Sequence, residues 1–286
     1  KVTKSFFLSK ESAIVINNWF MMYFLAVVLI GTIYPIFLEA ITAEKISVGP
    51  PYFNQLIIPF LIPFLFIMAL GTKLDWIKNK INKLKLKKIT LLVLSLLISF
   101  LIVRHLNDKI LYLTVLISAA LYLFFISIVD LRNEKLKWSQ KVSHLAFSIF
   151  IVSIILNSLF SEEVSVNLKT GEEKQLSNYL IKFEKLSKVE IDNYTALKAE
   201  IQVIQNNNNK LKFYPELRLY KVPETITSEA DIKTNLLNDN LVVVNYLKDT
   251  DYLNIRYQKK PFMLLIWLSA LLLAIGGALG LRTKFK

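Results

Sequence analysis

Long apolar runs separated by short polar loops dominate the first 160 residues of the chain. A helix needs about 20 mostly apolar residues to cross a bilayer, so each run is predicted to be a membrane-spanning helix. The five predicted ranges are approximately 18–38, 56–71, 89–103, 110–129 and 138–160. A sixth run covers 261–281. The pattern predicts a polytopic α-helical membrane protein with six spans.

Residues 161–260 follow a different pattern, in which apolar and polar residues alternate. Val164, Val166 and Leu168 alternate with polar residues and are followed by a turn at Lys169–Gly171. Alternation with period two, interrupted by Gly and Asn turns, is typical of β-hairpins. About a hundred residues suffice for a small β-barrel or sandwich. The chain is therefore expected to divide into helices at 1–160, a β-rich insert at 161–260, and a final helix with its tail at 261–286.

Proline and glycine interrupt the helical pattern around the second span. The segment SVGPPYFN occupies 47–54, and proline fixes φ and restricts the residue before it. We therefore expect a rigid loop from Glu39 to Gln55, with helix beginning at Leu56. Pro59 and Pro63 lie inside the span itself, where they could open carbonyls towards a cavity or could merely bend a packed helix.

The chain carries a net charge of +13, and 54% of its residues are apolar. Four short segments, 1–10, 73–88, 131–141 and 282–286, hold 17 of its 35 Lys and Arg residues. The β-rich insert is neutral, with 15 basic and 15 acidic residues. The excess is therefore loop charge, which predicts cytoplasmic ends, an insert on the outer side, and basic loops that touch membrane lipid. We expect no nucleic-acid partner.

The chain contains no cysteine, which excludes a CxxCH haem-attachment site, a thiol redox pair and disulfides within it. It begins with Lys1 rather than Met, and we expect that it is the later part of a longer protein.

His144 is the one ionisable residue well inside the predicted span 138–160. An ionisable group at that depth is costly and is a candidate for function. Trp138 and Lys141 stand where an interfacial aromatic residue and a snorkelling cation would anchor the helix end. Three roles are open for the imidazole: a hydrogen bond across a helix interface, haem or metal ligation, and proton transfer. His105, the other histidine, is predicted to be an interfacial polar residue at the opposite membrane face, and this topology argues against an iron shared with His144.

Several short segments, in this order along the chain, resemble the C-terminal half of the CcmF family. They are NN at 17–18, GTIYP at 31–35, SVGPPYFN at 47–54, SHL at 143–145, NY at 193–194, PELRLY at 215–220, TSEADI at 227–232, KPF at 260–262 with Trp267, and GG at 276–277. CcmF is the haem lyase subunit of the multi-component cytochrome c maturation pathway, System I. The resemblance covers essentially the whole chain.

The resemblance implies a role in attaching haem to the CxxCH thiols of apocytochrome c outside the membrane. In this family, two histidines on different helices hold a transmembrane haem b that helps to keep the transferred haem reduced. His144 matches the downstream axial ligand of that haem iron, and the other ligand belongs to the upstream half of the family. No catalytic residue is expected in this chain. A loop at the haem cavity or partner surface could be formed by Ser47, Val48, Gly49, Pro50, Pro51 and Tyr52.

The expected partners are the upstream half of the same haem lyase, a haem chaperone, apocytochrome c, thiol-handling maturation subunits and membrane lipid. The expected location is the bacterial inner (cytoplasmic) membrane with a periplasmic β domain, or the mitochondrial inner membrane. The alternative is a non-haem membrane scaffold that docks the haem chaperone and apocytochrome. A transporter is disfavoured because the spans hold almost no charge and show no internal repeat.

Overall fold

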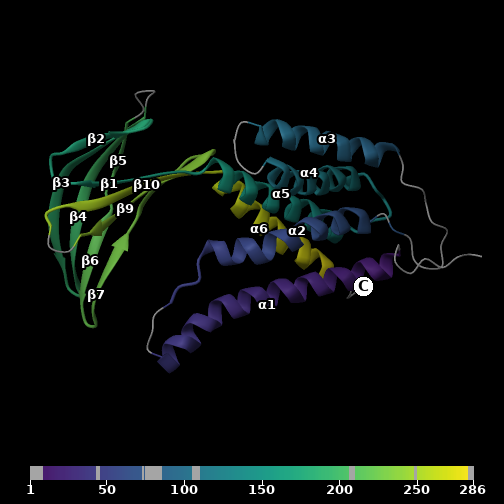
Figure 1. The fold of residues 1–286 in the computed structure, drawn as a ribbon, viewed down its shortest axis with the longest axis horizontal. Helices are drawn as coiled ribbons and strands as arrows, with labels where there is room; N and C mark the ends of the chain where they lie inside the picture. Colours follow the sequence, from purple (N-terminus) through teal and green to yellow (C-terminus); the bar gives the residue numbers. More distant parts are fainter. Residues whose placement is uncertain are drawn as a thin grey trace, which may run out of the picture. The chain divides into compact units, whose positions relative to one another are not determined.

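The computed structural model describes residues 9–42, 46–72, 74, 86–104, 110–205, 210–247 and 250–282. Two compact units are distinguished along the chain. One comprises Lys1–Val152 with Ser269–Lys286 and is helical, and the other comprises Ser153–Leu268 and contains the strands (Figure 1).

The helices of the described residues are α1 (Lys10–Thr42), α2 (Pro50–Gly71), α3 (Leu86–Val103), α4 (Ile110–Leu131), α5 (Trp138–Phe160) and α6 (Met263–Arg282). Five of them are long and apolar enough to cross a membrane, and α3 has a shorter apolar stretch, Lys88–Val103. The predicted class, an α-helical membrane protein with a β-rich insert, is confirmed, although α3 is shorter than a typical crossing helix.

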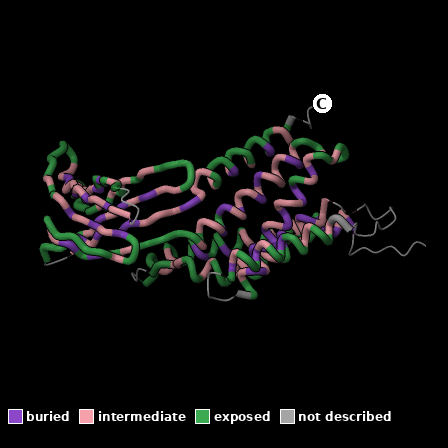
Figure 2. The backbone as a smooth tube through the Cα atoms, turned by 90° about the horizontal axis from the view of Figure 1, so that it is seen from above, coloured by how far each residue is buried: buried purple, intermediate pink, exposed green. Residues whose placement is uncertain are grey.

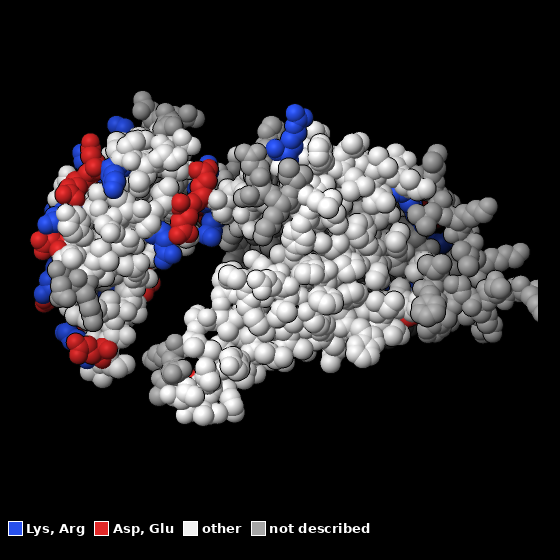
Figure 3. Space-filling view, in the orientation of Figure 1, with Lys and Arg blue, Asp and Glu red and all other residues white. Residues whose placement is uncertain are grey.

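The outward faces of the helices are apolar, as a lipid-facing surface requires. Large side chains such as Trp19, Met22 and Phe37 of α1 are exposed, and Figure 2 shows exposed residues along the length of the helices. In the view of Figure 3, charged side chains gather on the strands, whereas the helices present mostly uncharged surface. These features indicate a multi-pass membrane protein.

The predicted loop over Glu39–Gln55 is wrong at both of its ends. Helix α1 continues to Thr42, and α2 begins at Pro50. Pro50 and Pro51 occupy the first turn of α2, where a missing N–H costs no helical hydrogen bond and the fixed φ suits the helix. The prolines therefore start the helix that they were expected to exclude.

The final helix also begins later than predicted, at Met263. Pro261 is the last residue of β10, where it is paired with Asn238 of β9.

The β unit consists of two antiparallel sheets packed face to face. One has the strand order β1-β10-β9-β8 and the other the order β2-β3-β4-β6-β7, with β5 paired to β4. The strands are β1 (Glu162–Leu168), β2 (Glu173–Leu176), β3 (Tyr179–Ile191), β4 (Tyr194–Gln205), β5 (Lys210–Phe213), β6 (Glu216–Lys221), β7 (Glu224–Glu229), β8 (Asp231–Thr234), β9 (Asn238–Tyr246) and β10 (Leu253–Pro261).

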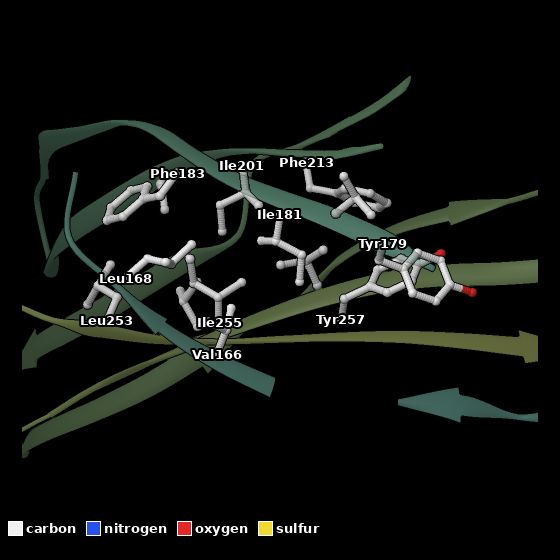
Figure 4. Packing of buried hydrophobic residues seen from close by; sticks show 14 of the residues in the cluster. Val166, Leu168, Tyr179, Ile181, Phe183, Ile201, Phe213, Leu253, Ile255 and Tyr257 are labelled. Carbon is white, nitrogen blue, oxygen red and sulfur yellow. The ribbon is translucent and has the colours of Figure 1, made fainter. Parts of the chain in front are cut away.

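The core of the β unit lies between the two sheets. Val166 and Leu168 of β1, two of the alternating apolar residues, are buried beside Ile255 of β10 and face Ile181 and Ile201 of the second sheet (Figure 4). Gly171 adopts a positive φ of 89° in the predicted turn that follows β1, a conformation that favours glycine.

Candidate functional site

His144 lies six residues into α5, about 9 Å along the helix at 1.5 Å per residue. Its side chain lines a cavity of about 450 Å³ within the helical unit. Four helices contribute to the wall: α1 gives Lys10, Ala13, Ile14, Asn17 and Met21; α2 gives Phe64, Ile67, Met68, Gly71 and Thr72; α5 gives Gln140, Ser143, His144 and Phe147; and α6 gives Leu273. A volume of this size is typical of small-molecule and cofactor sites.

The cavity wall is mainly apolar, with polar groups near the helix ends. Phe64 and Phe147 meet edge to face, with ring centroids 6.0 Å apart. Among the described lining residues, Lys10 and His144 are the only ionisable ones. An apolar wall with one imidazole and one cation suits a flat apolar ligand that carries a metal ion and anionic groups.

Small residues let the helices around His144 approach one another closely. Gly276 of α6 lies against Ser143, the residue before His144, and a Cβ at 276 would come within 2.9 Å of the Ser143 backbone nitrogen. Gly71 of α2 faces Ala13 of α1, and a Cβ at 71 would lie 3.6 Å from the Ala13 Cβ. Close backbone contacts of this kind are typical of membrane helix interfaces.

Lys141 does not have the snorkelling role that its position suggested. Its side chain is buried, and its ammonium donates to the Leu131 carbonyl at 3.0 Å while lying 4.7 Å from the Trp138 ring centroid. Lys141 therefore joins the start of α5 to the end of α4. Trp138 is exposed, and its place at the membrane interface stays a prediction.

A buried carboxylate beside the cavity was not found by sequence reasoning. Asp130, near the end of α4, is only 3% exposed and accepts a hydrogen bond of 2.9 Å from the hydroxyl of Thr72, which lines the cavity. The available signal was a lone acidic residue at the end of an apolar run, since a carboxylate is rarely buried without partners.

The segment Ser47–Tyr52 does not line this cavity. Ser47–Gly49 precedes α2, and Pro50–Tyr52 forms its first turn. Tyr52 precedes Ile67 by 15 residues, which is about 22 Å along a helix. The Tyr52 and Phe53 rings instead lie against Gly31 of α1, where a Cβ would meet Tyr52 at 2.8 Å. His105 lies outside the described residues.

Phe147 and Ser148 lie three and four residues after His144, on the same side of α5, but their side chains have different surroundings. Phe147 lines the cavity. Ser148 is fully buried, and its hydroxyl donates to the Leu145 carbonyl of the same helix at 2.7 Å.

A bundle of apolar helices whose chain leaves the membrane once to form an antiparallel β-sandwich defines a class of multi-pass membrane protein. Within that class, residues 159–261 match the family model described as the CcmF C-terminal beta-sandwich. Over nearly its whole length the chain is similar to the C-terminal part of cytochrome c-type biogenesis proteins of the CcmF family, the resemblance that the sequence segments indicated.

The similarity extends well beyond the β-sandwich. The "Cytochrome c-type biogenesis protein CcmF" of Haemophilus influenzae is 27% identical over 95% of this chain and 44% of its own length. The Pseudomonas fluorescens protein of the same description is 28% identical over 95% of this chain and 43% of its own length. A solved structure, "Cytochrome c Heme Lyase CcmF", shares the fold, with a TM-score of 0.70 and 18% identity over 96% of this chain and 46% of that one. The chain thus spans less than half the length of these relatives.

Proposed function

We propose that this chain is the C-terminal part of a cytochrome c haem lyase and that His144 supplies one axial ligand to a transmembrane haem b. The observation that carries the proposal is the cavity beside His144, which is walled by four helices and lined mainly by apolar side chains. The matched relatives are described as cytochrome c-type biogenesis proteins, which supports a role in the same process.

The residues around the cavity fit a haem. Neutral imidazole is a normal axial ligand of haem iron. Phe64 and Phe147 offer aromatic surface to a macrocycle and exclude water, while Lys10 stands at the polar end, where it would face carboxylates. When bound, the haem supplies one-electron redox chemistry, which would keep the iron of the transferred haem reduced. The second axial ligand would come from the upstream half of the lyase.

The location follows from the same proposal. The chain would lie in the bacterial inner membrane, or the mitochondrial inner membrane, with the β-sandwich on the outer side between the last two spans. Basic residues in the short loops favour that orientation. A haem chaperone, apocytochrome c and thiol-handling maturation subunits would be the partners there.

The test is the haem spectrum of the complete protein purified from membranes. His144→Gly should abolish the Soret and visible bands of a bis-imidazole b-type haem. Added imidazole should restore them, because it can occupy the space of the missing side chain. Ser148→Ala is the matched control: it lies one turn further along α5, bonds to a carbonyl of its own helix, and should leave the bands unchanged.

Two results would contradict the assignment. An unaltered spectrum in His144→Gly would remove His144 from the iron. A complete, active complex that contains no haem in its membrane part would instead favour the non-haem scaffold.

A further inference from the structure

Two leucines stand exposed at the tip of the hairpin that joins β8 to β9. Leu236 is 81% exposed and Leu237 is 69% exposed. Turn residues of a water-facing hairpin are usually polar or glycine, because they gain nothing by burial. Two adjacent leucines at such a tip therefore indicate a surface that meets an apolar phase.

The turn that presents the leucines is well ordered. The side-chain oxygen of Asn235 accepts hydrogen bonds from the backbone nitrogens of Leu237 at 2.9 Å and Asn238 at 2.7 Å. The backbone nitrogen of Asn235 in turn donates to the Asn238 carbonyl at 3.0 Å. The turn is closed by its own polar groups, so the leucine side chains are left to point outward.

The tip lies beside the points where the chain enters the membrane-spanning helices. The Leu237 carbonyl accepts a hydrogen bond of 2.9 Å from the backbone nitrogen of Phe262, the residue immediately before α6. Pro261, next to Phe262, accepts a hydrogen bond from the Asn157 side chain in the last turn of α5. The tip is therefore held at the level where α5 ends and α6 begins.

Two lysines lie in the strands near the leucines. Lys233 of β8 and Lys259 of β10 both stand opposite Asn240 of β9 in the strand register. Each lies within two residues of the end of its strand that is nearest the tip. With Gln205, Thr234 and Asn238, they line a cavity of about 230 Å³. Lys259 is also ion-paired with Glu162 at 3.6 Å, and the Lys233 ammonium lies 5.4 Å from the Phe213 ring centroid. Cations this near an inserted apolar tip suit the headgroup layer.

We infer that the β8–β9 tip is a membrane anchor, in which Leu236 and Leu237 insert into the lipid interface beside α5 and α6. The β-sandwich is then held to the membrane at three points, the ends of the two helices and this hairpin. An apolar tip with flanking cations is the general arrangement of interfacial anchors. This inference does not depend on haem binding.

The absence of cysteine from the chain allows a direct test. Leu236→Cys and Leu237→Cys would each carry an environment-sensitive fluorophore, in the complete protein reconstituted in lipid nanodiscs. The complete protein without an introduced cysteine, treated with the same fluorophore, measures the background labelling. Tyr246→Cys is the matched control, since Tyr246 is 54% exposed at the other end of β9, eight residues or about 27 Å from Asn238.

Probes at 236 and 237 should emit at shorter wavelength than the probe at 246. Nitroxide-bearing lipids should quench the probes at 236 and 237, and aqueous iodide should not. The probe at 246 should be quenched by iodide and not by the nitroxide lipids. Iodide quenching at 236 and 237 equal to that at 246 would overturn the inference. Shielding from both quenchers would also overturn it, because a protein would then cover the tip.

Discussion

Gly276 of α6 and Ser143 of α5 touch through their backbones, directly before the histidine that lines the helical cavity. A Cβ at 276 would come within 2.9 Å of the Ser143 nitrogen, a distance that real side chains do not adopt. Gly277, its neighbour in the GG pair, has nothing within 4 Å of the corresponding position. Of these two glycines, only Gly276 packs closely against a described helix.

Gly276→Ala should therefore disturb the His144 site. The added methyl group has to push α6 away from α5, and such overpacking costs about 1–3 kcal/mol. We expect a lower midpoint of thermal unfolding in detergent and, if His144 binds haem, a shifted or broadened Soret band.

Gly277→Ala is the control for that experiment, since its methyl group would meet open space. It should retain the parent unfolding midpoint and spectrum. Equal effects of the two substitutions would mean that helix propensity, rather than the contact with Ser143, determines the outcome.

Thr72→Val should destabilise the helical unit through Asp130. Valine keeps the shape of threonine but removes the hydroxyl that donates to this carboxylate at 2.9 Å. Depriving a buried acceptor of a partner costs about 1–3 kcal/mol. Thr32→Val is the control, because that exposed hydroxyl bonds to carbonyls of its own helix, and it should change the unfolding midpoint little. Equal shifts in the two variants would argue against the role of Asp130.

The sequence predicted those parts of the fold that local pattern determines. Helix α5 has the predicted bounds, Trp138–Phe160, because an uninterrupted apolar run marks a span. The alternation of Val164, Val166 and Leu168 with polar residues predicted a strand, and β1 forms there with Val166 and Leu168 in the core, because successive side chains of a strand face opposite sides.

Features that depend on contacts between distant segments were missed. Lys10 and Asn17 line the same cavity as His144 from a helix more than a hundred residues earlier in the chain. A helix that is apolar all round carries no periodic signal to show which face meets its neighbours. The start of α2 was misjudged for a local reason, because Pro50 can begin a helix as well as interrupt one.

Ile181→Ala should destabilise the β-sandwich strongly. Ile181 is fully buried between the two sheets, and truncating a core isoleucine to alanine costs about 2–5 kcal/mol. The free energy of unfolding by urea, followed through the near-ultraviolet circular dichroism of the tyrosines, measures the loss. Ile226→Ala is the control, since Ile226 is 61% exposed on β7. A comparable loss of unfolding free energy in Ile226→Ala would show that burial of Ile181 between the sheets does not account for the effect of Ile181→Ala.

Two core tyrosines predict that the β-sandwich loses stability in alkali. Burial and then the hydrogen bond to Glu162 raise the pKa of Tyr179 above its ordinary value of 10.0. Burial also raises the pKa of Tyr257, against the lowering effect of its hydrogen bond from Gln205. Above about pH 10 the unfolded chain releases phenol protons that the folded domain retains, so folding stability falls as the pH rises.

The measurement is the urea midpoint of the β-sandwich as a function of pH, together with tyrosinate absorbance. The double variant Tyr179→Phe and Tyr257→Phe should be less stable near neutrality, because Tyr257 donates to the buried Asn240 at 2.8 Å and would leave that amide oxygen without this bond. Its midpoint should nevertheless fall less steeply above pH 10 than that of the parent, because neither position can ionise. An unchanged alkaline slope in the double variant would assign the loss of stability to other groups.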